Sequence, residues 1–250
     1  MKEGECKMNK AKYISSILYD NSLDENSYLN NLPVIKYLAE YKELKFSSNI
    51  TFFVGENGTG KSTLLEAIAV AYGFNAEGGT RNFSFSTKDT HSELSEHLTL
   101  IKRDYAKDGF FLRAESLYNA ATYIDEVKAT HNYGYVSLHN QSHGESFLSI
   151  VQNRFSGKGL YLLDEPEAAL SPMRLMTLIV EIDKLLKNNS QFIIATHSPI
   201  LMAFPNAEIL QFSESGIEEV KYYETEHYKT TKLLIEEPEK TIHYLIDYNN

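Results

Sequence analysis

The chain has 250 residues, 42% of them hydrophobic, so it is long enough to bury a large core. Its formal net charge of −10 weighs against a broad basic surface of the kind that neutralises many nucleic-acid phosphates. No run approaches the roughly 18 consecutive apolar residues of a membrane helix, so we expect a cytoplasmic protein without membrane insertion.

The first part of the chain predicts a loop, a short helix, a strand and a second helix, in that order. Polar, Asn-rich residues 20–31 are typical of a loop, and residues 32–38 favour a short helix. Apolar residues 50–54 predict a strand. A helix is expected to follow at once over residues 61–71, because the apolar side chains there fall on one face.

The middle of the chain predicts an insertion. Residues 73–108 are of mixed polar composition with an amphipathic piece at residues 94–101, and a buried strand is expected at residues 109–113. We therefore predict one domain over residues 1–250, with an inserted helical and β lobe at about residues 74–140.

The second half of the chain predicts two buried strands, residues 160–163 and 191–195, each near-continuously apolar. Helices are expected at residues 142–154 and 171–188. Apolar strands that alternate with helices imply an α/β fold whose mostly parallel sheet is flanked by helices. The tail, residues 206–250, predicts a hairpin and two short helices.

Residues 55–62 fit the phosphate-binding pattern G-x-x-x-x-G-K-[ST] and lie between a predicted strand and a predicted helix, the context of a P-loop. Backbone N–H groups at a helix N-terminus bind phosphate oxygens, and we expect Lys61 to reach the β- and γ-phosphates of ATP. The Ser62 hydroxyl is expected to ligate Mg²⁺. The residues predicted to bind nucleotide here are Gly55, Glu56, Asn57, Gly58, Thr59, Gly60, Lys61, Ser62 and Thr63.

Two carboxylates follow the strand at residues 160–163. Acidic pairs after apolar strands are common by themselves, but a P-loop upstream gives this pair a specific role. We expect Asp164 to hold Mg²⁺ and Glu165 to polarise the attacking water. His197 follows the next buried strand, where its imidazole could contact a γ-phosphate, although a histidine at a strand end can also be purely structural.

A further anion site is suggested by Ser142 and Gly144, which stand where a helix is predicted to begin. Taken alone, this segment is better explained as a helix cap. The order and spacing of these motifs resemble the ABC ATPase superfamily, with a signature at residues 142–146 and a D-loop at residues 168–171. The sequence departs from that pattern in having His143, Glu145 and Ser171 at positions where the family usually has Gly, Gln and Asp.

More narrowly, five segments look like a family of compact, stand-alone bacterial AAA family ATPases, related to the head domains of DNA-repair and chromosome-maintenance ATPases. The resemblance is carried by residues 53–58, 73–79, 111–116, 142–146 and 162–172. It implies Mg-ATP as cofactor and hydrolysis of ATP to ADP and phosphate, with Lys61, Glu165 and His197 as catalytic residues.

The resemblance also implies a head-to-tail homodimer with two ATP molecules between the subunits, in which Ser142 and Gly144 act on the partner's ATP. At the position of the usual Q-loop glutamine, Glu115 could reach Mg²⁺ and Arg113 or Arg81 could supply positive charge to the phosphates. Tyr37 and Phe46 could stack on adenine, although a place in the core is the better default for both.

Other functions stay open at this point. One alternative is a nucleotide-sensing switch with slow turnover that signals to a protein partner. A transporter ATPase subunit and a P-loop kinase are further alternatives, although a kinase leaves Ser142 and His197 without a role. A DNA-linked process in repair or defence follows from the related head domains, but the net charge does not support nucleic-acid binding.

Overall fold

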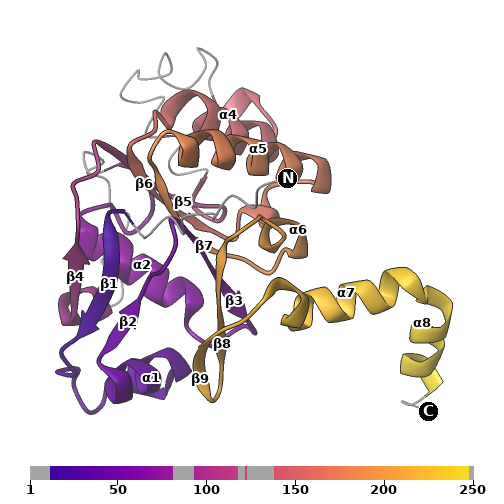
Figure 1. Cartoon of the computed structure of the whole chain (residues 1–250), viewed down its shortest axis with the longest axis horizontal. Coiled ribbons are helices and arrows are strands. Elements are labelled where there is room, and N and C mark those ends of the chain that lie inside the picture. Colours follow the sequence, from indigo (N-terminus) through magenta and orange to yellow (C-terminus); the bar gives the residue numbers. More distant parts are fainter. Residues whose placement is uncertain (1–11, 81–92, 118–121, 123–137, 248–250) are drawn as a thin grey trace, which may run out of the picture.

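The computed structural model describes residues 12–80, 93–117, 122 and 138–247. Two sheets and the helices around them organise these residues (Figure 1). The strands are β1 (Ile14–Tyr19), β2 (Glu43–Lys45), β3 (Ile50–Gly55), β4 (Leu98–Lys102), β5 (Asp108–Arg113), β6 (Gly159–Asp164), β7 (Gln191–Ala195), β8 (Glu208–Ser213) and β9 (Gly216–Glu219). The α-helices are α1 (Pro33–Tyr41), α2 (Lys61–Tyr72), α4 (His143–Arg154), α5 (Pro172–Lys187), α6 (Pro199–Met202), α7 (Glu226–Glu236) and α8 (Pro238–Asp247).

The larger sheet has six strands in the order β5-β6-β7-β3-β8-β9. The first five strands are parallel, and β9 returns antiparallel to β8 as a hairpin. The prediction of an α/β fold with a mostly parallel sheet is confirmed. Because neighbouring parallel strands point the same way, the residues that follow β3, β6 and β7 leave the sheet at one edge.

Both faces of the central strands β6, β7 and β3 are buried, which explains why these strands are apolar at nearly every position. In β6, Leu160 and Leu162 pack on the side of α2, whereas Tyr161 and Leu163 pack on the side of α4 and α5. Successive side chains of a strand point to opposite faces, so a strand covered on both sides needs apolar residues at every position. All six residues of β6 are buried.

The smaller sheet, in the order β2-β1-β4, is antiparallel and lies on the far side of α2. The sequence pattern did not predict β1. The amphipathic piece at residues 94–101, expected in the inserted lobe, contains the start of β4, which pairs along β1. Within the described part of residues 74–140, β4 joins the small sheet and β5 joins the large one, and the inserted lobe stays a prediction. The rest of that range, including Arg81, lies outside the described residues.

The C-terminal helices α7 and α8 extend away from the body at one side (Figure 1). Their exposed side chains include several large apolar residues, among them Leu233, Ile235 and Leu245. None of the helices within the described ranges is long and apolar enough to span a membrane.

The buried side chain of Gln191 joins the two sheets. It begins β7 and is 0% exposed. Its Oε1 accepts hydrogen bonds from the backbone N–H groups of Tyr13 (2.7 Å) and Ile14 (2.9 Å), and its Nε2 donates to the carbonyl of Ile14 (2.9 Å). Ile14 is the first residue of β1, so one amide satisfies three backbone groups where the small sheet meets the large one.

We expect Gln191→Leu to lower the free energy of unfolding by roughly 3 kcal/mol or more, because each buried backbone group left without a partner costs about 1–3 kcal/mol. Equilibrium urea unfolding measures this. Gln152→Leu is the matched control, since Gln152 lies exposed on α4 and its loss should change stability by less than about 0.5 kcal/mol. Equal losses in the two variants would contradict the assignment of a bridging role to Gln191.

Candidate nucleotide-binding site

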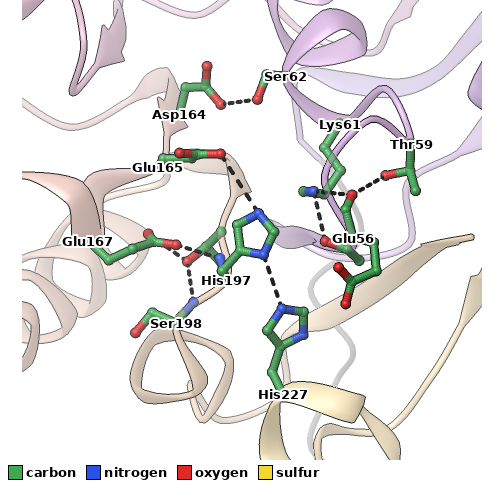
Figure 2. A network of polar contacts seen from close by, with 12 residues as sticks. Glu56, Thr59, Lys61, Ser62, Asp164, Glu165, Glu167, His197, Ser198 and His227 are labelled. Atoms are coloured by element: carbon green, nitrogen blue, oxygen red, sulfur yellow. Dashed lines mark hydrogen bonds and ion pairs between the residues drawn. The ribbon is translucent and has the colours of Figure 1, made fainter. Parts of the chain in front are cut away.

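A pocket of about 530 Å³ opens at the edge of the sheet where β3, β6 and β7 end. Figure 2 shows the polar side chains that meet beside it, contributed by the loops after these strands and by the start of α7. The pocket is lined by Leu32, Glu56, Asn57, Gly58, Gly60, Lys61, Ser62, Thr63, Glu115, Glu165 and His197. Most of the predicted P-loop residues therefore face one cavity together with Glu165 and His197.

Two glycines of the P-loop occupy positions that no other residue fits. Gly60 has φ +97°, and a Cβ added there would lie 2.3 Å from Cγ1 of Val34 in α1. Gly55 has φ +133°, and its Cβ would lie 2.1 Å from the carbonyl oxygen of Phe212. Only glycine combines this backbone conformation with such close packing. Gly60 also precedes α2 without a side-chain cap, so the helix N-terminus stays open to an anion.

Lys61 is almost fully buried at the base of the loop, with 4% of its surface exposed. Its Nζ donates hydrogen bonds to the carbonyl oxygens of Gly55 and Glu56, both at 2.8 Å. Burial lowers the pKa of Lys61, while the nearby carboxylates of Glu165 and Asp164 oppose that shift. The cation is thus held by the loop's own backbone (Figure 2), and the charges of Glu165 and Asp164 act on it.

The pair Ser62 and Asp164 joins the P-loop helix to the end of β6. The Ser62 hydroxyl donates a hydrogen bond of 2.8 Å to Oδ1 of Asp164. Burial is the main cause that raises the pKa of Asp164 to about 6, although Arg113 and Ser62 lower it. A buried carboxylate that pairs with a hydroxyl in this way presents oxygen ligands of the type a hard divalent cation prefers.

Glu165 has a strained backbone. It follows β6 with φ 47° and ψ 53°, the left-handed conformation that non-glycine residues rarely adopt. Its N–H donates to the carbonyl of Ala195 (3.0 Å), which fixes the turn against the end of β7. Its Oε1 then lies 3.8 Å from Nε2 of His197.

Glu167, which was not among the predicted site residues, links the loop after β6 to the loop after β7. Its carboxylate accepts a hydrogen bond from the backbone N–H of His197 and another from the hydroxyl of Thr196 (2.8 Å). Burial is the main cause that raises the pKa of Glu167. Glu167 is the third acid within residues 164–167. Buried carboxylates need hydrogen-bond donors, so this cluster of acids after a buried strand could have indicated its role from the sequence.

His227, near the start of α7, is the second residue that the motifs did not reveal. Its Nε2 lies 3.1 Å from Nδ1 of His197, and the two rings are 5.2 Å apart between centroids. Burial is the main cause that lowers the pKa of both imidazoles. Nε2 of His197 is itself buried without a hydrogen-bond partner among the described residues.

Arg113 and Glu115 lie near the pocket in different ways. The guanidinium of Arg113 forms ion pairs with Glu66 (2.7 Å) and Asp164 (3.4 Å) and does not line the cavity. Glu115 lines it, with 82% of its side chain exposed. Arg113 therefore contacts the predicted metal ligand, whereas its predicted contact with phosphate stays a prediction.

The predicted signature residues lie away from the pocket. Ser142 caps α4 in a capping box with Glu145, and Arg174 of α5 donates to its hydroxyl (3.0 Å). A Cβ on Gly144 would lie 2.5 Å from Nη1 of Arg174. Both Ser142 and Gly144 are among the described residues, and neither lines the pocket.

The two aromatic candidates for adenine stacking also lie away from the pocket lining. Phe46 is buried in the core, where it stacks on Phe53, and Tyr37 stacks on Tyr41. Leu32 is the apolar residue of the P-loop pocket's wall. Thr59 is buried and bonds to the carbonyl of Glu56 (2.8 Å), so it shapes the loop from within.

Comparison with known proteins identifies one matching family model and one related protein. The AAA domain family model AAA_23 matches residues 29–243. Structural maintenance of chromosomes protein 6 from Takifugu rubripes is 32% identical over 81 residues, which is 32% of this chain and 7% of that protein. The chain thus spans a small part of this much longer relative.

Solved structures are similar at lower identity. CbiO1 from Clostridium perfringens, described as part of the ABC transporter complex cbiONQ, superposes with a TM-score of 0.50 at 16% identity, covering 94% of this chain and 100% of that one. The SMC head domain from Thermotoga maritima has a TM-score of 0.45 at 15% identity, covering 84% of this chain and 98% of that one. The chain therefore belongs to the AAA domain family AAA_23, and its fold is that of the ABC-type P-loop ATPases.

Proposed function

We propose that this chain binds and hydrolyses ATP as an ABC-type ATPase, in a head-to-tail homodimer that closes around two ATP molecules and opens after hydrolysis. The observation that carries the proposal is which of the predicted site residues line the pocket. P-loop, Glu165 and His197 meet around one cavity, whereas Ser142 and Gly144 lie outside its lining. A second copy of the chain would supply the missing pair in trans, as the resemblance to the superfamily implies.

The residues present fit Mg-ATP. Ser62 and Asp164 offer oxygen ligands, and the buried Nε2 of His197 lacks a hydrogen-bond partner in the described structure. In the parts of the chain that are described, no three His, Cys, Asp or Glu side chains could hold a metal ion. This agrees with Mg²⁺, which usually takes one or two protein ligands and completes its shell with phosphate oxygens and water. When bound, Mg²⁺ neutralises negative charge on the β- and γ-phosphates.

The remaining chemistry falls to side chains of the chain itself. Lys61 and the open N-terminus of α2 bind the phosphates. Glu165 accepts a hydrogen bond from the attacking water and orients it toward the γ-phosphate. His197, 3.8 Å from Glu165, contacts the γ-phosphate from the same side. Hydrolysis removes contacts that only the closed dimer makes, and the subunits separate.

For the process that uses this motion, we propose a DNA-linked task. It is supported by the 81-residue similarity to structural maintenance of chromosomes protein 6. To test the DNA-linked task alone, ATP turnover is measured with and without duplex DNA at low salt, and we expect DNA to increase it. Turnover that does not change with DNA would contradict the DNA-linked task and leave the ATPase proposal intact. The formal net charge of −10 makes low salt the informative condition.

We expect Glu165→Gln to lower ATP turnover at least about 100-fold, because it removes the carboxylate that orients water. We also expect the variant to accumulate as a dimer with Mg-ATP and to stay monomeric without it, measured by size-exclusion chromatography with light scattering. Glu214→Gln, at the exposed tip of the hairpin between β8 and β9, is the matched control and should behave like the unmodified protein. Unchanged turnover and a monomer with ATP bound would reopen the kinase alternative.

A mixing experiment tests the action in trans. Lys61→Ala disables the P-loop, and Ser142→Asp keeps a good helix cap but places a negative charge where the partner's γ-phosphate would lie. Each variant alone should be inactive. An equal mixture should recover about a quarter of normal turnover, because half of randomly formed dimers are mixed and each of these has one intact site of two.

Ser142→Asn, tested alone and in the same mixture, separates the effect of the added negative charge from the effect of the changed side-chain shape. Asn has nearly the shape of Asp and also caps helices, but it carries no charge. This variant should lose less activity than Ser142→Asp. If no mixture recovers any turnover, both motifs act within one subunit and the sandwich proposal fails.

A further inference from the structure

His227 stands at the site although no motif contains it. It is the second residue of α7, a helix whose start is fixed by buried Thr225, which accepts a hydrogen bond from the N–H of Tyr228 (3.3 Å). This cap presents the imidazole of His227 to His197, at 3.1 Å between Nε2 and Nδ1. Figure 2 shows the two rings in line with Glu165, so that His197 lies between His227 and the acid.

The two nitrogens of the His197 ring have different neighbours. Nδ1 faces the nitrogen of His227, whereas Nε2 faces Glu165 at 3.8 Å and has no hydrogen-bond partner among the described residues. A carboxylate attracts an N–H and repels a lone pair, so Glu165 favours the proton of His197 on Nε2. A phosphate, whose oxygens accept hydrogen bonds, requires the proton at the same place.

A neutral imidazole carries one N–H, so a proton on Nε2 leaves Nδ1 as an acceptor. The 3.1 Å contact is then a hydrogen bond only if His227 donates from its own Nε2. Burial lowers the pKa of both rings, in agreement with two neutral imidazoles that each carry one N–H. The tautomer of one histidine is thereby set by the hydrogen bond of the other.

We propose that His227 is a positioning residue: its Nε2–H donates to Nδ1 of His197 and holds His197 in the tautomer whose Nε2–H points to the γ-phosphate end of the pocket. This inference rests on the proposed function for its effect on turnover, but the tautomer itself is a property of the nucleotide-free chain. His227 acts through His197 and does not touch the nucleotide.

The tautomer is measured first, by NMR of the full chain labelled with ¹⁵N at histidine, without nucleotide. His197 is assigned by the loss of its signals in His197→Ala. We expect ring-nitrogen shifts of the Nε2–H form in the unmodified chain and a mixture of tautomers in His227→Leu. Shifts of the Nδ1–H form in the unmodified chain would overturn the proposal, whether or not the protein hydrolyses ATP.

Turnover is measured second. His227→Leu should lower kcat roughly 10- to 100-fold, the range seen when the hydrogen-bond partner of a metal-ligating histidine is removed. The KM for ATP should change less than about twofold, since binding through the P-loop is retained. His227→Gln, whose amide nitrogen can donate in place of Nε2, should recover most of the activity.

Two further variants separate positioning from a general loss of structure. In a His197→Ala background, His227→Leu should cause no additional loss, because a residue that acts through another has no effect once that other is gone. His243→Leu, which changes an exposed histidine of α8, should leave turnover unchanged. Full turnover in His227→Leu would overturn the proposal, whereas an unmodified chain that shows the Nε2–H form but no turnover would refute the ATPase function alone.

Discussion

The parallel register of β3, β7 and β6 is the constraint on which the site depends. Ala195 of β7 pairs with Asp164 of β6 on one side and with Phe53 of β3 on the other. Since the carboxyl ends of adjacent parallel strands lie at one edge, the P-loop, the acidic residues and His197 emerge side by side. The core thus places groups that are more than a hundred positions apart in the sequence, and Glu167 has only to tie two neighbouring loops together.

Much of this arrangement could be predicted from the sequence because the large sheet is covered on both faces. Strands such as β6 and β7 are apolar at nearly every position, and the P-loop pattern carries its own glycine requirement. By contrast, β1 could not be predicted: it contains the buried polar residue Ser16 and is stabilised by pairing with β4, which is far along the chain. Its existence is decided by tertiary context more than by local preference.

The side chains around His197 show a second limit of sequence patterns. His227 reaches the site only because the start of α7 lies against the loop that follows β7, where His227 contacts His197, and no spacing rule connects a histidine of the tail to a P-loop. The positive charge of Arg113 made it a candidate phosphate ligand in the sequence. Its position between Glu66 and Asp164, however, follows from the pairing of β5 with β6. Motifs therefore identify the groups that contact a ligand better than the groups that orient them.

The left-handed backbone at Glu165 has a consequence for engineering. A residue with a Cβ pays about 1–2 kcal/mol for this conformation, whereas glycine adopts it freely and asparagine nearly so. A library of variants sorted for heat resistance alone would therefore enrich glycine and asparagine at this position and discard the carboxylate. Selection for a more thermostable variant therefore needs to exclude position 165 from mutagenesis, because thermal stability and the chemistry of the pocket favour different residues there.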